Sequence, residues 1–375
     1  MKKICMLVTN SVRKDPRVRK EAISAVNAGY EVVVIGIMDA NYDDSFVDSV
    51  PYRIVLINEI KNNYRRFTFQ WLLKGISKTC YYNKKFVEYT VNERPDLIHS
   101  NDYDTLNAGY KASRKCKCEQ IYDSHEVATG SILAERFKFV KAWIKFNEGR
   151  IIRKVKATIS VSNAAADYLA SLYHVSRPTV VTNCPCFVTS KQREDNQIVD
   201  VLYQGIMSPG RGYEEFVESA KYITNNAHLT IRGYGEIKDK LINMAEDMGL
   251  NDRITFENPV EISELISAAS KSSVGVVLTK PVCNNYKLTV SNKLFEYIQA
   301  RIPVILSDVP EHRYLLEKYK FGILLDEISP NAIANAINTI SSNNEIYNAM
   351  KVNVEIAAKE LCWETFEKSL LELYE

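Results

Sequence analysis

The feature that most constrains the fold is a regular alternation of short apolar segments, rich in β-branched residues, with helical segments along the whole chain. The apolar segments predict strands at 4–8, 31–37, 96–100, 120–125, 157–162, 200–205, 229–233, 254–258, 274–279, 303–308 and 322–326. A helical segment at 18–28 ends before Gly29, a residue typical of helix C-termini. Strands that alternate with helices indicate parallel sheets with helices on both faces.

These strands and the chain length predict an α/β protein with two Rossmann-like domains. A chain of 375 residues exceeds the size of a typical single domain. We expect an N-terminal domain at 1–185, a C-terminal domain at 198–360, and a last helix at 361–375 that packs across the boundary and returns towards the N-terminal domain. Open parallel sheets bind ligands at the carboxyl ends of their strands, so we expect a site in a central cleft between the domains.

Composition and cysteine spacing indicate a cytoplasmic globular protein. Hydrophobic residues make up 46% and charged residues 25% of the chain, which is ordinary for globular proteins. No apolar run approaches the ~18 residues that a membrane-spanning helix needs. The start, MKKICMLVTN, has too short an apolar part for a secretion signal and predicts a buried first strand. The eight cysteines include no Cys-x-x-Cys pair and no histidine at zinc spacing, so we expect reduced thiols.

Charge is distributed unevenly between the two halves of the chain. Residues 1–190 hold 29 Lys or Arg against 19 Asp or Glu, whereas the remainder holds 19 against 27. Such a difference indicates halves with different partners. The basic residues occur with apolar helices rather than in a recognised nucleic-acid-binding module, so we expect no nucleic acid partner.

The sequence YQGIMSPGRGYEEF at 203–216 predicts a strand that ends at Gly205, a glycine-rich loop and a helix. Gly210 and Gly212 allow a ligand to approach the backbone, and Arg211 offers a forked cation beside the positive end of the helix. This pattern suits a diphosphate, and a solvated turn is the alternative. No complete G-x-G-x-x-G fingerprint occurs in the chain, which disfavours a dinucleotide cofactor.

Three further segments place glycines or polar residues where predicted strands end. In RGYGE, Gly233 and Gly235 indicate either a tight turn or a surface that contacts a ligand. In NDYDT, Asp102 and Asp104 have the spacing of a metal–nucleotide motif, but this spacing is common in loops and we expect no metal there. In YDSHE, His125 lies where it can act as an acid, a base or a hydrogen-bond donor to a substrate, or be a structural histidine.

The stretch SNKLFEYIQARIPVILSD at 291–308 predicts a short amphipathic helix followed by a strand. Leu294, Tyr297 and Ile298 account for the packing of the helix, which leaves its polar start and Glu296 available for another purpose. The positive end of a helix binds anions, and a carboxylate accepts hydrogen bonds from two hydroxyl groups. We therefore expect the start of this helix to bind a ligand.

These motifs together resemble glycosyltransferase family 4. The resemblance spans nearly the whole chain, with DPRVRKEAISAVNAGYEVVVIG at 15–36, DLIHSNDYD at 96–104, IYDSHE at 121–126 and, most specifically, NKLFEYIQARIPVILSDVPEHRYLLEKYKFGILLD at 292–326. It implies the GT-B fold and transfer of a sugar from a nucleotide-sugar with retained anomeric configuration, without an obligatory metal or other cofactor. By frequency within the family, the implied nucleotide is UDP.

The resemblance also implies roles for individual residues. The implied catalytic residues are His125, Arg211, Lys293 and Glu296. Glu296 would hold the ribose hydroxyls, Arg211 the diphosphate, and His125 would lie near the transferred sugar. The implied donor-binding residues are Gly205, Gly210, Gly212, Gly233, Tyr234, Asn284, Asn285, Tyr286, Ser291, Asn292 and Leu294. The implied residues on the acceptor side are Asp15, Arg17, Asp102 and Glu126.

Two positions depart from the family pattern. The family often has a second glutamate eight positions before the residue that matches Glu296, and this chain has Leu288 there. An arginine that often follows the strand-end glycine is replaced by Ile206. We therefore expect residues 284–286 to contact the sugar.

The implied activity is that of a hexosyl- or N-acetylhexosaminyltransferase in cell-surface polysaccharide or glycoconjugate synthesis, with a glycan or a lipid-linked sugar as acceptor. One alternative is a nucleotide-sugar epimerase on the same fold, which would convert the donor without an acceptor. Another is a non-catalytic GT-B partner subunit, which the changes at Leu288 and Ile206 suggest.

Two basic and aromatic segments predict attachment to a membrane surface. Residues 135–156 contain eight basic and two acidic residues, and a helix there would place Phe139, Trp143 and Phe146 in one apolar row beside lysines. Residues 61–85 combine Lys or Arg with aromatic residues in the same way. A core helix with a solvated basic face is the alternative. Interfacial helices pair an apolar face with cations that attract anionic lipids, so we expect peripheral attachment to the inner face of the cell membrane.

Overall fold

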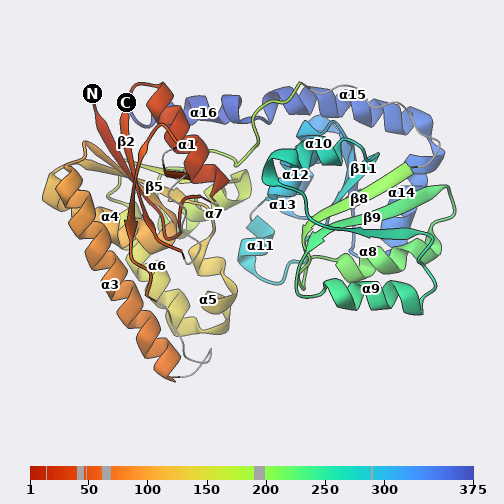
Figure 1. Cartoon of the computed structure of the whole chain (residues 1–375), viewed down its shortest axis with the longest axis horizontal. Coiled ribbons are helices and arrows are strands. Elements are labelled where there is room, and N and C mark those ends of the chain that lie inside the picture. The colour runs from red at the N-terminus through yellow and green to blue at the C-terminus, as the bar shows by residue number, and fades with distance from the viewer. Residues whose placement is uncertain (14, 40–45, 48, 61–68, 190–198, 289) are drawn as a thin grey trace. The chain divides into compact units, whose positions relative to one another are not determined.

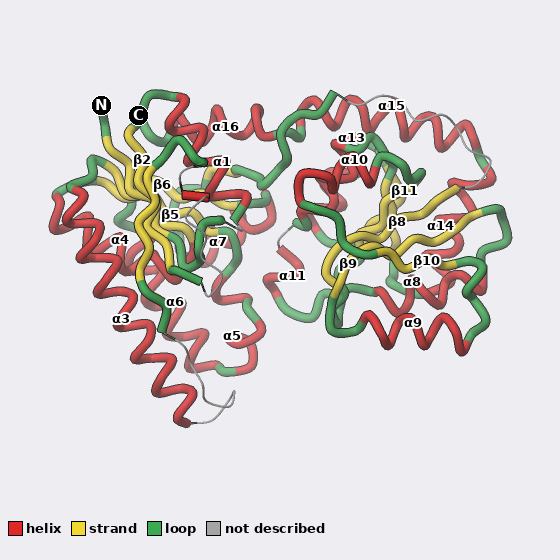
Figure 2. The backbone as a smooth tube through the Cα atoms, viewed as in Figure 1, coloured by secondary structure: helices red, strands yellow, loops and turns green. Residues whose placement is uncertain are grey.

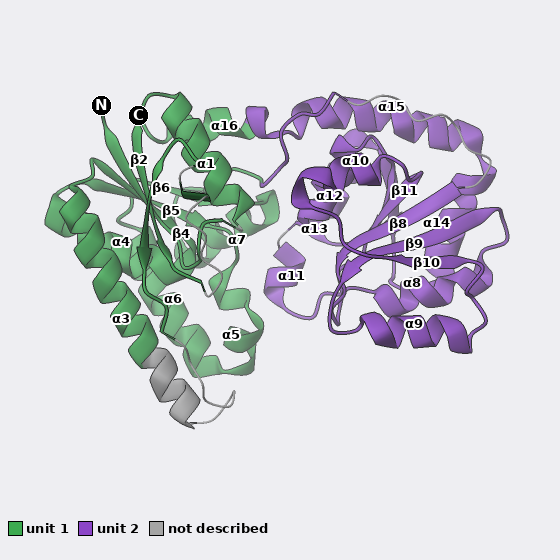
Figure 3. Ribbon diagram, viewed as in Figure 1, with its two compact units in different colours: residues 1–182, 366–375 green, residues 183–365 purple. Residues whose placement is uncertain are grey.

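The computed structural model describes residues 1–13, 15–39, 46–47, 49–60, 69–189, 199–288 and 290–375, with the backbone alone at 69–76. Within these residues the chain divides into two compact units, residues 1–182 with 366–375 and residues 183–365 (Figure 3). Each unit is a parallel sheet with flanking helices (Figures 1 and 2). The prediction of an α/β chain with two Rossmann-like sheets is therefore confirmed.

Unit 1 is built on a sheet whose described pairings are all parallel. Its strands are β1 (Lys3–Leu7), β2 (Glu31–Ile37), β3 (Arg53–Ile57), β4 (Leu97–Asn101), β5 (Glu119–Ser124), β6 (Ala157–Ser160) and β7 (Thr179–Val180). Their order is β3-β2-β1-β4-β5-β6-β7. The order reverses between β1 and β4, and open parallel sheets bind ligands at the carboxyl ends of strands beside such a reversal.

Two strands of unit 1 were not predicted from the sequence. β3 lies at one edge of the sheet, where most of its residues are only half-buried, so its apolar run RIVLI is short and weakly marked. β7 lies at the other edge and has only two residues. A strand of that length has no side-chain periodicity that a sequence pattern can reveal.

The helices of unit 1 follow its strands in alternation. They are α1 (Pro16–Asn27), α3 (Phe69–Glu93), α4 (Asp102–Cys116), α5 (Ile132–Arg136), α6 (Lys138–Ile152), α7 (Asn163–Tyr173) and the last part of α16 (Trp363–Glu372), with a 3₁₀ turn at Ala128–Gly130. α1 begins where the sequence favours it, because Pro16 fits the first turn and the Asp15 side chain accepts a hydrogen bond there. Gly29, at φ +91°, follows its end.

The prediction of a single helix at 135–156 is wrong, because the segment forms two helices. The chain leaves the helical conformation at Phe137, with φ −122° and ψ 100°, so α5 ends at Arg136 and α6 begins at Lys138. The row of Phe139, Trp143 and Phe146 lies wholly within α6 and keeps its helical spacing. Among the described helices, none is both long and apolar enough to cross a bilayer.

Unit 2 repeats the architecture with a second parallel sheet. Its strands are β8 (Val199–Ile206), β9 (Ala227–Tyr234), β10 (Ile254–Glu257), β11 (Val274–Val277), β12 (Val304–Ser307) and β13 (Gly322–Leu325), in the order β10-β9-β8-β11-β12-β13. Its helices are α8 (Tyr213–Ser219), α9 (Lys238–Asp247), α10 (Leu265–Ala269), α11 (Asn284–Leu288), α12 (Asn292–Gln299), α13 (Pro310–Tyr319), α14 (Pro330–Ser342) and α15 (Asn344–Glu360), with 3₁₀ turns at Ala220–Tyr222 and Ile262–Glu264. Here the order reverses between β8 and β11, so the end of β8 is the expected ligand position.

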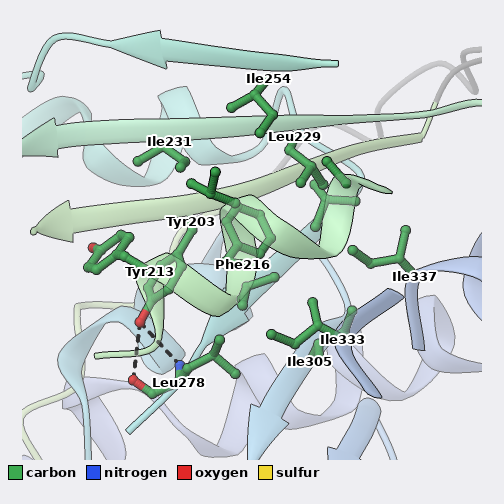
Figure 4. Close-up of a cluster of buried hydrophobic side chains, with 14 of the residues drawn as sticks. Tyr203, Tyr213, Phe216, Leu229, Ile231, Ile254, Leu278, Ile305, Ile333 and Ile337 are labelled. Carbon is green, nitrogen blue, oxygen red and sulfur yellow. Dashed lines mark hydrogen bonds between the residues drawn. The ribbon is translucent and has the colours of Figure 1, made fainter. Parts of the chain in front are cut away.

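The hydrophobic core of unit 2 (Figure 4) includes residues near the end of β8, where a ligand is expected. The ring of Tyr203 on β8 stacks on Tyr213 at a centroid distance of 4.0 Å and meets the edge of Phe216 at 5.5 Å. The Tyr203 hydroxyl donates to the carbonyl of Leu278 at 3.1 Å and also bonds the carbonyl of Arg211. Because buried polar groups need partners, this hydroxyl fixes both chain segments, and the core thereby positions the loop that carries Arg211.

Candidate active site

His125 directly follows β5 in unit 1 and lies between two carboxylates. Its Nδ1 is 3.2 Å from Asp102 and its Nε2 is 3.1 Å from Asp123. Its backbone N–H also donates to the Asp102 side chain at 3.1 Å. Burial by itself disfavours charge on the ring, but Asp102 and Asp123 outweigh it and raise the pKa of His125 well above its usual value. His125 is therefore an imidazolium ion at neutral pH.

Behind His125 the Asp123 carboxylate belongs to a buried ion-pair network. The Arg17 guanidinium donates two hydrogen bonds to Asp123, at 2.9 and 2.8 Å. The same guanidinium lies 3.0 Å from Glu21. Burial would raise the pKa of Asp123, but Arg17 and His125 hold that pKa well below its usual value. Burial raises the pKa of Glu21 well above its usual value, so Asp123 is the ionised carboxylate and Glu21 the neutral acid.

His99 on β4 connects this network to the end of the chain. Its Nδ1 lies 2.7 Å from the Tyr374 hydroxyl, and its Nε2 lies 3.5 Å from Asp123. Burial lowers the pKa of His99, so the ring is neutral. His99 and Tyr374 were not predicted as site residues. His99 is the penultimate residue of the predicted strand DLIHS, which is the only sequence signal for the pair, because Tyr374 is brought near by folding alone.

The residues expected on the acceptor side occupy different environments. Asp102 and Glu126 lie at the accessible edge of the cluster. Arg17, by contrast, is only 3% exposed, so it reaches the site through Asp123 and not by direct contact. Asp15 accepts a hydrogen bond from the first turn of α1 and therefore has a capping role.

One group of side chains in unit 1 has the composition of a metal-binding site. Among the described residues, the group of His, Cys, Asp and Glu side chains close enough to share an ion is Glu21, Asp123 and His125, whose ligand atoms lie within 4.8 Å of one another. The Arg17 guanidinium is paired with two of the three, which places a positive charge where a cation would bind. This group therefore fits an ion-pair network and not a metal centre.

In unit 2, Lys293 lies directly across Gly205. A Cβ atom at position 205 would come within 2.1 Å of Lys293 Cε, and the φ of +123° also requires glycine. On the neighbouring strand, a Cβ at Gly233 would come within 2.0 Å of the Gly205 carbonyl oxygen. The two strand-end glycines thus allow β8, β9 and the Lys293 side chain to approach one another closely.

Lys293 and Arg211 form a pair of cations at this strand end. Burial, and then the charge of Arg211, lower the pKa of Lys293 to about 8, against the opposing effect of Glu296. Arg211 lies between Gly210 and Gly212, and its guanidinium lies 4.3 Å from the centroid of the Tyr286 ring. A lysine whose pKa is depressed beside a second cation indicates a site for an anion, whose binding would favour the charged form of Lys293.

The start of α12 contributes its polar end to the same region. Ser291 occupies the N-cap position, but its side chain makes no capping hydrogen bond to the helix. Asn292 is exposed, whereas Leu294 is fully buried and anchors the helix. Because the first amides of a helix carry partial positive charge, this end adds to the attraction that Lys293 exerts on an anion.

Glu296 lies one turn into α12 and is paired with a residue that the sequence analysis missed. Its Oε2 accepts a hydrogen bond from Gln204 Nε2 at 2.9 Å. Burial raises the pKa of Glu296, against the opposing effects of Gln204 and Lys293. Gln204 is nearly fully buried, and its Oε1 has no hydrogen-bond partner in the described part of the chain. Its position directly before the strand-end glycine in YQG is the signal that would have identified it.

The remaining predicted donor residues lie on the two adjoining elements. Asn284, Asn285 and Tyr286 form the first turn of α11. Tyr234 is paired with Ile206 in the register of β9 and β8, and both side chains are more than half exposed, at 58% and 53%. The structure therefore brings the predicted donor residues together at one end of the unit 2 sheet.

Two family models match the chain, and together they cover both units. The model described as Glycosyltransferase Family 4 matches residues 18–185, and the model described as Glycosyl transferases group 1 matches residues 189–356. The chain belongs to glycosyltransferase family 4. It is therefore a sugar-transferring enzyme with two Rossmann-like domains.

Solved structures that resemble this glycosyltransferase share its fold over the full length. A sucrose-phosphate synthase from Thermosynechococcus elongatus is 18% identical with a TM-score of 0.75, over 100% of this chain and 98% of that one. HepE from Anabaena, in complex with UDP and glucose, is 14% identical with a TM-score of 0.75, over 99% of each chain. A TarM mutant from S. aureus, in complex with fondaparinux, alpha-GlcNAc-glycerol and UDP, is 13% identical with a TM-score of 0.74, over 100% of each chain. No curated protein matches the sequence.

Proposed function

We propose that this glycosyltransferase transfers a hexosyl or N-acetylhexosaminyl group from a UDP-sugar to a glycan or a lipid-linked acceptor, with retention of anomeric configuration. The observation that carries the proposal is the pair of cations, Arg211 and Lys293, beside Gly205 and the start of α12. The presence of UDP in the structures of HepE and TarM supports the choice of nucleotide.

The proposed donor position follows from the contacts in unit 2. The diphosphate lies against Arg211, Lys293 and the first amides of α12, where no side-chain cap competes for them. One turn further along, Glu296 accepts hydrogen bonds from the ribose hydroxyls, and Gln204 holds its carboxylate in place. Hydrogen bonds to a charged carboxylate are among the stronger ones, so Glu296 sets donor affinity.

In the proposed reaction, the bond between the anomeric carbon and the diphosphate oxygen breaks. The acceptor hydroxyl oxygen bonds to the same face of the sugar, and its proton passes to the leaving diphosphate. Negative charge therefore accumulates on the diphosphate, where Arg211 and Lys293 stabilise it. Because these two cations supply the charge that a divalent ion would supply, we propose no obligatory metal.

On the acceptor side, the charge state of His125 determines its role. A ring whose pKa is raised and that is already protonated donates hydrogen bonds and does not act as a base. Its partner on the accessible side is Asp102, whose side chain is 40% exposed. Because both ring N–H groups of His125 already face carboxylates, we assign the exposed Asp102 carboxylate to accepting hydrogen bonds from sugar hydroxyls, with His125 holding it in place.

The proposed function includes attachment to the inner face of the cell membrane, for the synthesis of a polysaccharide or glycoconjugate. On α6, the side chains of Phe139, Trp143 and Phe146 are 68%, 65% and 65% exposed, and Lys138 and Lys145 on the same helix are also exposed. Exposed apolar groups flanked by cations suit an anionic lipid surface. In the other basic segment, 61–85, residues 61–68 and the side chains of 69–76 lie outside the described residues.

A thermal-shift screen against UDP-, GDP- and other nucleotide-sugars tests the donor assignment. We expect UDP-sugars to raise the melting temperature, because a ligand that binds only the folded state stabilises it. Glu296→Ala should remove this shift while the unliganded protein still melts cooperatively, with a loss of donor affinity of about 1.5–3 kcal/mol for each charge-assisted hydrogen bond. Unchanged donor affinity in this variant would exclude the ribose assignment.

Product analysis then separates the classes of activity. The proposal requires release of UDP and a glycoside of the same anomeric configuration as the donor, which NMR of the product shows. Conversion of the donor into another nucleotide-sugar without an acceptor would identify an epimerase. Failure to bind any nucleotide-sugar would identify a non-catalytic subunit.

A further inference from the structure

A long groove crosses the helical face of unit 1. Helix α4 lies between α3 and α6 (Figures 1 and 2), and residues from all three helices line the groove. Its volume is ≈ 1770 Å³, and its surface is predominantly apolar. Pockets for compact ligands hold roughly 300–1,000 Å³. The groove follows α4 from Asp102 to Lys115, a length of roughly 20 Å at the helical rise per residue, so its size suits an elongated ligand.

The α6 side of the groove is apolar. Val140 and Ile144 are half-buried and line it. Phe139 and Trp143 also line it, although most of each side chain is exposed. Phe146, on the same helix, is equally exposed but does not belong to the groove. Helix α6 thus presents apolar side chains both to the outer surface and to the groove.

The groove also reaches the acceptor side of the site. Asp102, whose carboxylate holds His125, and Glu126 both line it. These residues lie at the carboxyl ends of β4 and β5, where the unit 1 sheet is expected to receive its ligand. A molecule that occupies the groove therefore brings one of its ends to the His125–Asp102 pair.

We infer that this groove binds the hydrocarbon chain of a lipid-linked acceptor, whose saccharide lies at Asp102 and Glu126. The inference rests on the proposed transfer reaction and names the acceptor class within it. A glycan of the same length would need hydrogen-bonding partners along its whole length. Polar side chains such as Asn83, Asn107 and Lys111 line the α3 and α4 sides of the groove, but most of its surface is apolar. A hydrocarbon chain needs only apolar surface, because its binding is driven by release from water.

A homologous series of n-alkyl maltosides, from octyl to dodecyl, tests the inference. Calorimetric titration below the micelle-forming concentrations, without donor and without vesicles, measures binding to the groove alone. We expect the affinity to rise by up to about fourfold for each added methylene until the groove is filled, with maltose alone bound far more weakly. Affinity that does not depend on chain length would overturn the inference, as would tighter binding of maltohexaose than of dodecyl maltoside.

Two variants of α6 separate the groove from the outer surface. Ile144→Glu places a charge on the apolar side and should weaken dodecyl maltoside binding roughly tenfold or more, whereas the control Phe146→Ser should leave it unchanged. Equal weakening in both would mean adsorption to the exposed surface and would overturn the inference. Val140→Trp, which fills the groove without adding charge, serves as a second variant, and thermal melting verifies the fold of each.

The outcome is independent of the donor site. If nucleotide-sugars fail to bind unit 2 while alkyl maltosides bind with the expected chain-length dependence, the proposed transfer reaction is wrong, and the groove is a hydrocarbon-binding site without the acceptor role. If donor transfer to a water-soluble glycan proceeds while alkyl maltosides do not bind, the groove assignment is wrong and the reaction stands.

Discussion

The Tyr374 hydroxyl lies 2.7 Å from Nδ1 of His99, although the two residues are 275 positions apart in the chain. His99 is fully buried, and its other ring nitrogen faces Asp123 at 3.5 Å and Glu21 at 3.7 Å. Because Asp123 also holds His125, the last residues of the chain complete the buried support of the acceptor side. Tyr374 is therefore a positioning residue that acts through His99.

Tyr374→Phe should destabilise unit 1 and lower turnover without changing donor affinity. The substitution leaves a buried ring nitrogen without its partner, which costs about 1–3 kcal/mol. The lost contact is in unit 1, so titration with UDP should give an unaltered dissociation constant. Tyr319→Phe removes a hydroxyl that bonds Glu360 in unit 2 and is the matched control, with unaltered turnover. A Tyr374→Phe enzyme with full activity and normal melting would remove the positioning role.

Gly205→Ala should abolish donor binding because the new methyl group would overlap Lys293. A Cβ at this position comes within 2.1 Å of Lys293 Cε, so the ammonium group has to leave its position beside Arg211. Positive φ contributes strain as well, and Gly29→Ala controls for it, since Gly29 has φ +91° and nothing within 4 Å of its Cβ position. We expect the control to lose about 1 kcal/mol of stability and to bind UDP normally. Equal UDP affinity in both variants would show that Lys293 does not bind the diphosphate.

The strand ends and helix starts of the site were predictable because they depend on short-range patterns. An apolar run followed by glycine predicted the end of β8. A polar start followed by helical spacing of apolar residues predicted α12, on which Glu296 lies one turn from Lys293. These features need only local backbone preferences and the alternation of buried faces. For the same reason the alternation of strands and helices followed from the sequence, apart from the two edge strands β3 and β7.

Features that depend on packing between distant segments were not predictable. The break at Phe137 has no glycine or proline to mark it. The resemblance implied Arg17 as a residue on the acceptor side, and only the fold shows that it is buried and paired with Asp123. Likewise, nothing in the last residues of the sequence indicates that Tyr374 reaches His99, because that contact depends on the path of the whole chain.

UDP affinity should fall as the pH rises above about 8, the pKa to which burial and Arg211 lower Lys293. Below this pH the ammonium group is already charged and attracts the diphosphate. Above it, the free enzyme has lost the proton and must take one up on binding, so the dissociation constant should rise by up to about tenfold per pH unit. Lys293→Arg should remove this dependence because arginine stays protonated. The same slope in both proteins would assign the titration to another group.

His125 should remain protonated through neutral pH, and Asp102→Asn should lower its pKa. Burial opposes the charge, and Asp102 makes the largest contribution that raises the pKa. Neutralising Asp102 therefore lowers the pKa of His125. Each pKa unit of that change corresponds to about 1.36 kcal/mol of lost stabilisation of the protonated ring. Titration of the ring resonances by NMR measures the shift. His312, whose pKa burial lowers to about 4, provides a reference that stays neutral. An unchanged His125 pKa in Asp102→Asn would contradict the pairing.

The enzyme should sediment with anionic vesicles at low salt and less so at high salt, because the lysines of α6 attract anionic lipid only within the screening length. Phe146→Ser should weaken vesicle binding roughly 10- to 100-fold, since burying an aromatic side chain of this size contributes about 1.5–3 kcal/mol. Val352→Ser is the matched control, because Val352 is 63% exposed on α15 in unit 2, and it should bind vesicles as the unaltered enzyme does. Equal binding to neutral and anionic vesicles would exclude the cationic contribution. Equal loss in both variants would place the attachment surface elsewhere than on α6.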